Sequence, residues 1–269
     1  MKNTLALVVA GTITGLAMSA SAAEYQCLIE PYQKIELRSA VEALIESVLV
    51  ERGSVVRKGQ PLVRLNSGVE EASLASARYR AIMEGQVRSS TARVELAREK
   101  YRRRSELSQQ NFISAQDRDD SLAEMKVAEA DLVEAKDNRE LSALESKRLE
   151  ELLRQRTLVS PFNGIVTELL QNPGELAQTG EGARPILRLA QIHPLRVEVV
   201  LPVNVYDTIK RGTVAEVEAE APSKSRHRAS VLIVDKVVDS ASGTFGVRVE
   251  LPNPNGNILA GVKCKVNFR

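Results

Sequence analysis

The feature that most constrains this chain is a long central segment without the residues that disfavour an α-helix most. No proline occurs between Pro61 and Pro161, and Gly85 is the only glycine inside the segment from Val69 to Arg156. The segment is rich in Ala, Leu, Glu, Lys, Arg and Gln, which are the residues that a helix accommodates at least cost. We therefore predict that residues 69–156 are helical.

A break near the middle of this segment predicts that the chain turns back on itself. Residues 111–114 interrupt the helical pattern, and Ser114 followed by Asp117 has the form of an N-cap with an acidic residue at the third helical position. Each arm of the resulting hairpin has roughly 40 residues, or about 60 Å at 1.5 Å per residue.

Residues at spacings of three and four along each arm predict an antiparallel coiled coil. On the outgoing arm they are Met83, Val87, Ser90, Val94, Ala97 and Tyr101, and on the return arm Met125, Ala128, Leu132, Ala135, Arg139, Ser142, Ser146, Leu149 and Leu153. The alternative is a rod packed against other helices of a globular core, but such helices carry a broader apolar face. We expect a projecting, solvated hairpin.

The N-terminus has the layout of a secretory signal peptide. An early lysine precedes an apolar run from Leu5 to Met18 and small residues at 20–23, so we expect residues 1–23 to be removed on export. The apolar run is short for a membrane span, and no later segment is long enough. The residues before Cys27 lack the pattern of a lipoprotein processing site, so no lipid anchor is predicted.

The two cysteines lie near opposite ends of the exported chain. In an oxidising compartment Cys27 and Cys264 could form a disulfide, which would contribute roughly 4 to 5 kcal/mol in the chain-entropy model. Two free, buried thiols are the alternative, because sequence alone cannot place the sulfurs in contact.

Composition and motifs give no support for catalysis or nucleic-acid binding. The 37 basic and 35 acidic residues nearly balance, and tryptophan is absent, so aromatic platforms for stacking bases are scarce. His193 and His227 are isolated, and no metal-ligand spacing, phosphate loop or nucleophile motif occurs. We expect no enzyme activity, no metal and no cofactor.

The segments that flank the rod resemble each other. Residues 39–45 align with 160–166 without a gap, and the same offset pairs Gly53 with Gly174. After a short insertion, 61–65 matches 185–189. Each half contains short β-prone runs between glycine turns, so two half-sheets are expected to pack face to face, with the rod inserted between them.

The C-terminal part alternates β-prone runs with Gly, Pro and Asn turns, as in a small antiparallel barrel. The expected strands are Arg196 to Leu201, Val214 to Ala219, Ser230 to Val238, Phe245 to Leu251 and Val262 to Phe268. A short helix is expected within 201–210.

Residues 41–62, the rod and residues 159–166 together resemble the split biotinyl/lipoyl-like domain of the periplasmic adaptor proteins, the membrane fusion proteins of the HlyD type. Residues 239–262 resemble the end of that family's β-barrel. The resemblance implies an α+β fold in which a long antiparallel helical hairpin is inserted in a split lipoyl-like β-sandwich, followed by a small antiparallel β-barrel. The expected domains are a signal peptide (1–23), an N-terminal strand with the first sandwich half (24–68), the hairpin (69–156), the second sandwich half (157–192) and the barrel (193–269).

The resemblance also implies a function. Adaptors of this family link an inner-membrane efflux pump, with the resistance-nodulation-division (RND) type favoured here, to a TolC-like outer-membrane channel, and they form a ring, usually a hexamer. Alternatives are an adaptor for ABC-type or protein secretion, or a periplasmic coiled-coil scaffold without a transporter. An enzyme-associated carrier would need a modified lysine on the hairpin that the rod replaces here, so no prosthetic group is expected.

The hairpin tip matches the family's channel-binding pattern, which is an Arg, a Leu four residues on and a Ser seven residues after that. Arg103, Leu107 and Ser114 have this spacing. In the family these residues meet the helix-turn tips of the outer-membrane channel. Each residue also has an alternative explanation within the hairpin. Arg103 could be a solvated arginine, Leu107 could make a packing contact within the turn, and Ser114 could serve only as an N-cap.

The chain departs from the family pattern at two places. Ala43 stands where the second repeat has Gly164, a difference that we expect the turn to tolerate. Arg269 follows soon after the barrel motif, so the membrane-proximal domain of longer adaptors is expected to be absent or reduced. This leaves the pump-contacting residues and the pump class open.

Overall fold

The computed structural model describes residues 24–221 and 224–269, and the expected signal peptide lies outside the described residues. The chain forms two compact units. The sandwich-hairpin unit is Lys34–Ala190, and the barrel unit combines the described residues up to Gln33 with Gln191–Arg269. Within the described ranges, no helix has the length and apolar character needed to cross a membrane.

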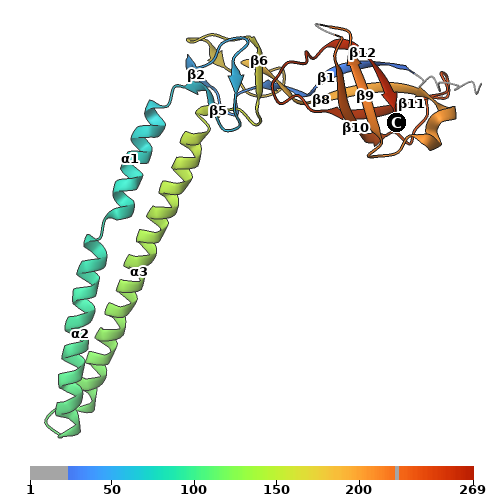
Figure 1. Cartoon of the computed structure of the whole chain (residues 1–269). Helices are drawn as coiled ribbons and strands as arrows, with labels where there is room; N and C mark the ends of the chain where they lie inside the picture. The colour runs from blue at the N-terminus through green and yellow to red at the C-terminus, as the bar shows by residue number, and fades with distance from the viewer. Residues whose placement is uncertain (1–23, 222–223) are drawn as a thin grey trace, which may run out of the picture. The chain divides into compact units, whose positions relative to one another are not determined.

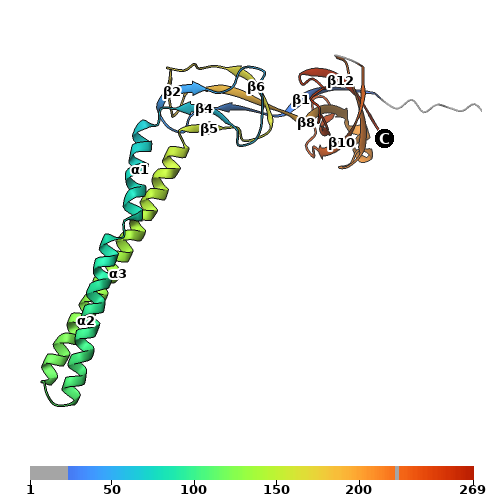
Figure 2. The same ribbon diagram turned by 60° about the vertical axis from the view of Figure 1, so that its left-hand side comes forward.

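The hairpin consists of three helices rather than two (Figure 1). Helices α1 (Gly68–Ile82) and α2 (Gly85–Gln109) form the outgoing arm, and α3 (Ala115–Arg154) forms the return arm. The interruption of the outgoing arm was not predicted. Met83 adopts an extended conformation (φ −67°, ψ 124°), and Gly85, which costs a helix interior about 1 kcal/mol relative to Ala, follows directly. Figure 2 shows the break beside an uninterrupted α3.

The seam between the two arms is narrow, as the spacing predicted. Ser90, Val94 and Ala135 are buried at the expected positions. The expectation was wrong for Met83, which is 55% exposed because it lies in the break. Arg139 faces the outgoing arm as expected, where its guanidinium lies 3.8 Å from the Glu84 carboxylate. Three buried residues of the arms lie outside the expected positions: Leu74, Ala77 and Ser121.

The split sandwich is confirmed. One sheet has the order β5-β4-β2-β7, and it is made of Thr157–Val159, Pro61–Leu65, Ala43–Val48 and Leu176–Ala177. The opposing strands are β3 (Val55–Val56), β6 (Gly164–Leu169) and the beginning of β8 (Leu187–Pro202).

Positions that the internal repeat aligns are buried in both halves of the sandwich. The repeat pairs Ile45 with Val166 and Leu62 with Ile186, and all four side chains are at most 1% exposed. The sandwich core is therefore built from the same positions of both half-sheets, on either side of the inserted hairpin.

The barrel is closed by six strands. Their order is β1-β12-β9-β10-β11-β8, and β8 also pairs with β1. The strands not yet introduced are β1 (Tyr25–Leu37), β9 (Val214–Ala219), β10 (Arg226–Val234), β11 (Thr244–Leu251) and β12 (Val262–Phe268). The short helix expected after β8 is a 3₁₀-helix, η1 (Val203–Thr208).

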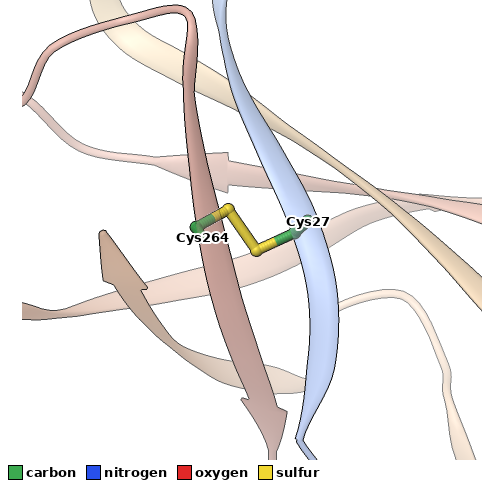
Figure 3. The surroundings of a disulfide bond; sticks show 2 residues. All are labelled: Cys27 and Cys264. Atoms are coloured by element: carbon green, nitrogen blue, oxygen red, sulfur yellow. A yellow bond between two sulfur atoms is a disulfide. The ribbon is translucent and has the colours of Figure 1, made fainter. Parts of the chain in front are cut away.

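A disulfide ties the first barrel strand to the last (Figure 3). Cys27 of β1 lies opposite Cys264 of β12 in the antiparallel pair, with a Cα–Cα distance of 4.8 Å. The two side chains are 8% and 0% exposed. The bond therefore holds the N-terminal strand in the barrel wall.

Candidate functional site: the hairpin tip

The tip is a tight turn closed by backbone hydrogen bonds. The Asn111 N–H donates to the Ser108 carbonyl at 3.0 Å, and the Phe112 N–H donates to the Leu107 carbonyl at 2.9 Å. Asn111 has a φ of 59°, in the left-handed region that Asn enters more readily than most residues. These bonds satisfy carbonyl groups at the end of α2.

A capping box begins α3 and confirms the predicted N-cap. The Ser114 hydroxyl accepts the Asp117 N–H at 3.1 Å and donates to Asp117 Oδ2 at 2.6 Å, and the Ser114 N–H donates to the same carboxylate at 3.3 Å. The hydrogen bond from the Ser114 hydroxyl, followed by that from its N–H, lowers the pKa of Asp117. The Ser114 hydroxyl hydrogen is thus engaged within the turn.

A second contact ties the two arms together at the tip. Arg104 Nη1 of α2 donates to the backbone carbonyl of Asp117 in α3 at 3.2 Å. Together with the capping box, this bond fixes the start of α3 against the end of α2. The tip is therefore a defined surface rather than a loose loop.

Arg103 and Leu107 lie four residues apart on α2 and share its face. The Arg103 side chain is 63% exposed, and its Nε lies 3.7 Å from Glu99 Oε1, which is too long for a hydrogen bond. The same carboxylate is held by Arg102 at 2.6 Å. Leu107 is 41% exposed. The Arg103 donors and the Leu107 side chain are therefore both accessible to a partner.

Phe112 is the tip residue that sequence reasoning missed. It is 73% exposed, although a large aromatic side chain normally avoids water. Its N–H is bonded to the Leu107 carbonyl, so the ring is carried on a fixed backbone. The sequence signal for it is an aromatic residue inside the helix break at 111–114.

Comparisons with known proteins agree with this architecture. Residues 79–149 match the family model described as "RND MFP, alpha-helical hairpin domain". The chain is 23% identical over 244 residues to the multidrug resistance protein MdtE of Escherichia coli K12, covering 86% of this chain and 60% of MdtE. It is 24% identical over 289 residues to the macrolide export protein MacA of Escherichia coli O157:H7, covering 98% of this chain and 77% of MacA.

Among solved structures, the crystal structure of MacA from Actinobacillus actinomycetemcomitans superimposes with a TM-score of 0.75. The sequence identity is 18%, and the match covers 91% of this chain and 77% of that one. The chain therefore shares the fold of this MacA structure, and its hairpin matches the hairpin domain of the RND membrane fusion proteins. It spans about 60% of the length of MdtE, the first curated relative that it matches.

Proposed function

We propose that the protein is a non-enzymatic periplasmic adaptor that connects an inner-membrane efflux pump to a TolC-like outer-membrane channel. The observation that supports this proposal most strongly is the structure of the tip. A hydrogen-bonded turn at the end of a solvated hairpin exposes the side chains of Arg103, Leu107 and Phe112. The RND pump class follows the description of the matching hairpin family. Small-molecule cargo follows the printed names of MdtE and MacA.

Each tip residue has a distinct physical role in the proposed contact. Leu107 and Phe112 would fill apolar notches in the channel, where complete burial of such a side chain contributes about 1.5–3 kcal/mol. Arg103 would donate to backbone carbonyls, such as those left open at the end of a helix. Ser114 would act mainly through the capping box, which holds the other residues in place.

The proposal places the mature protein in the periplasm after cleavage of residues 1–23, without a lipid anchor. The Cys27–Cys264 bond supports an oxidising compartment, because disulfides persist there and are rare in the cytosol. Several copies, six in the proposed assembly, would surround a common exit path.

The test is export in cells that carry a single variant as their only source of the protein. Leu107→Asp places a charge in the proposed contact, and Leu96→Asp places the same charge on a more exposed leucine midway along α2. We expect Leu107→Asp to abolish tolerance to toxic small molecules that the pump exports and Leu96→Asp to preserve it. Full tolerance with Leu107→Asp at normal protein levels would contradict the proposal.

A further inference from the structure

The β10–β11 loop and the 3₁₀-helix η1 lie at the same end of the barrel. Strand β8 runs from Gln191, where the chain enters the barrel unit, to Pro202, and η1, orange in Figure 1, follows it. The loop of residues 235–243 reaches this end as well, because the Val203 N–H donates to the Gly243 carbonyl at 3.0 Å. One end of the barrel is therefore formed by η1 and this loop.

This end carries a cluster of exposed aliphatic side chains. They are Val203 (50% exposed), Ile233 (41%), Val237 (82%) and Val238 (37%). Val237 is the most exposed large hydrophobic residue in the part of the chain that the structure describes. Single apolar residues scattered over a surface need no explanation, but a group of them at one end of a barrel marks a site of interaction.

The loop between β10 and β11 is held at both ends by backbone hydrogen bonds. The Asp235 N–H donates to the Gly246 carbonyl at 2.9 Å, and the Asp239 N–H donates to the Thr244 carbonyl at 2.8 Å. The valines between these two bonds are thus carried on an anchored backbone. Less conformational freedom is lost when such a loop binds a partner than when a loose loop does.

A groove of about 580 Å³ with basic residues on its walls lies beside this loop. Tyr206 and Ile233 are among its lining residues, together with Lys210, Arg211 and Lys236, whose side chains are exposed. None of these three cations forms an ion pair with another described residue. They are therefore available to bind anionic groups at the edge of the aliphatic cluster.

Three acidic residues also lie at this end, and two of them have carboxylates directed at the backbone of the chain itself. The Asp239 carboxylate accepts the Ala241 N–H at 2.9 Å. The Asp235 carboxylate occupies the space that a side chain at Gly246 would fill. Asp207 lines the groove and is exposed. The charge that is free to meet a partner is therefore mainly positive.

We propose that this end of the barrel binds the surface of a phospholipid membrane that contains anionic lipids. The valines of the loop enter the boundary between headgroups and acyl chains, and the three cations of the groove bind lipid phosphate groups. The inference goes beyond the adaptor role proposed above, and the hairpin tip takes no part in it.

The chemistry of the cluster favours a membrane over a protein partner. The residues that dominate protein–protein binding are enriched in Trp, Tyr and Arg and lie in fully desolvated pockets. Here the most exposed apolar side chain is the valine at position 237 of a loop, and two of the three cations are lysines. The ring of Tyr206 already packs edge-on against Phe245, with 5.0 Å between ring centroids. An aliphatic loop among cations suits a fluid surface, which needs no complementary pocket.

The test is flotation of the purified mature protein with lipid vesicles. One set of vesicles contains phosphatidylethanolamine with phosphatidylglycerol as the anionic component, and the other contains phosphatidylcholine alone. We expect the protein to float with the anionic vesicles and to bind the phosphatidylcholine vesicles at least ~10-fold more weakly. Binding to the anionic vesicles should weaken as the salt concentration rises, because salt screens the attraction of exposed charges.

The cations are tested by replacing two lysines at this end of the barrel. Lys210→Gln with Lys236→Gln should weaken binding to anionic vesicles about 25-fold, since each basic residue near such a surface contributes about fivefold. The matched control is Lys224→Gln with Lys263→Gln, which removes two exposed lysines beyond the other end of β9, where the Glu220 N–H donates to the Lys263 carbonyl at 3.0 Å. This control should bind like the natural protein.

The aliphatic cluster is tested by Val237→Asp, which should weaken vesicle binding roughly 10-fold or more because the loop no longer enters the apolar boundary. Leu259→Asp is its control, on a residue that is 51% exposed in the connection between β11 and β12. Neither change should alter the melting temperature. Equal binding by the Lys210 and Lys236 variant and its control would overturn the inference. Absence of binding to anionic vesicles would also overturn it and would leave the groove to a protein partner.

The result is separable from that of the export test. Leu107→Asp should bind anionic vesicles like the natural protein, because residue 107 lies at the end of the hairpin. Failure of vesicle binding with Leu107→Asp inactive in export would refute the membrane contact and leave the adaptor role standing. Strong vesicle binding with full tolerance of Leu107→Asp would support the membrane contact and contradict docking of the tip to a channel.

Discussion

A single glycine shows where the two halves of the repeat differ. Gly164 begins β6, and a Cβ on it would lie 2.3 Å from the Ala190 carbonyl oxygen and 3.0 Å from Phe162 Cε2. The aligned residue, Ala43, carries its methyl group within β2. Alanine is thus accommodated in the first half, whereas in the second half the close approach of β8 demands glycine.

We predict that Gly164→Ala destabilises the sandwich by roughly 1–3 kcal/mol, because the neighbouring atom is backbone and cannot move aside cheaply. The measurement is urea unfolding of the purified chain. Gly68→Ala is the control, since a Cβ there meets open space at the start of α1 and should be neutral or slightly stabilising. If the two variants were equally stable, the backbones of β6 and β8 would not lie as close together at Gly164 as the structure shows.

The capping box predicts an acid-sensitive tip. The pKa of Asp117 is lowered by its hydrogen bonds from Ser114, so the folded state binds this proton less readily than the unfolded state does. The stabilisation is complete above the ordinary carboxyl pKa of about 3.9 and is lost as the pH falls through the lower folded value. Amide hydrogen exchange at Asp117 and Arg118, whose N–H groups donate to Ser114, should show protection that falls below about pH 4 once it is corrected for intrinsic rates.

The matching variant is Ser114→Ala, which removes the cap and should cost the hairpin about 1 kcal/mol at neutral pH. Its exchange protection at Asp117 and Arg118 should also depend less on pH, while Ser114→Thr keeps a capping hydroxyl and should behave like the natural protein. If the loss of exchange protection at low pH were the same in Ser114→Ala, other carboxylates of the hairpin would be responsible for it.

At the scale of elements, strands were predictable where local pattern and pairing agree. The expected ranges Val214 to Ala219 and Val262 to Phe268 coincide with β9 and β12, because alternating burial is bounded by turns on both sides. Strand β10 runs over Arg226–Val234 instead of the expected 230–238. Its polar beginning is held by pairing with β9, and Val237 at the end of the expected strand is 82% exposed. The β-propensity of a residue does not show which neighbouring strand it will pair with.

The break in the outgoing arm was missed for a similar reason. Gly85 was visible in the sequence, but a single glycine is tolerated in many helices, and only the structure shows Met83 leaving the helix. The assignment of the first described strand was also not predictable. Residues 25–33 of β1 belong to the barrel unit, and residues 25–29 pair with β12 at the other end of the chain, a contact that no local pattern encodes.

That pairing predicts the effect of removing the disulfide. Replacing both cysteines (Cys27→Ala with Cys264→Ala) should lower the stability of the barrel by roughly 2–5 kcal/mol, since the unfolded chain is no longer closed into a long loop. Hydrogen exchange should show lost protection in β1 and β12, while the amides of α3 remain protected. Unchanged protection in β1 would mean that its ladder with β12 suffices to hold the strand.

For the whole molecule, the sequence and its family resemblance singled out Arg103, Leu107 and Ser114, and the structure gives these three residues different surroundings. Ser114 has its hydroxyl committed to Asp117, whereas Arg103 and Leu107 face solvent. The exposure of Phe112 was not predicted, because exposure depends on where neighbouring helices lie. An exposed aromatic residue at the tip suits a molecule whose proposed work is to bind other proteins.

The most direct measurement of the central claim is photocrosslinking from the hairpin in intact cells. A photoreactive residue is placed at Leu107 or Phe112 in the tip, and at Leu96 as the control on α2. Docking of the tip predicts capture of an outer-membrane channel from both tip positions and not from Leu96. Capture of adaptor copies alone, or of nothing, from a tip variant present at normal levels would contradict the account.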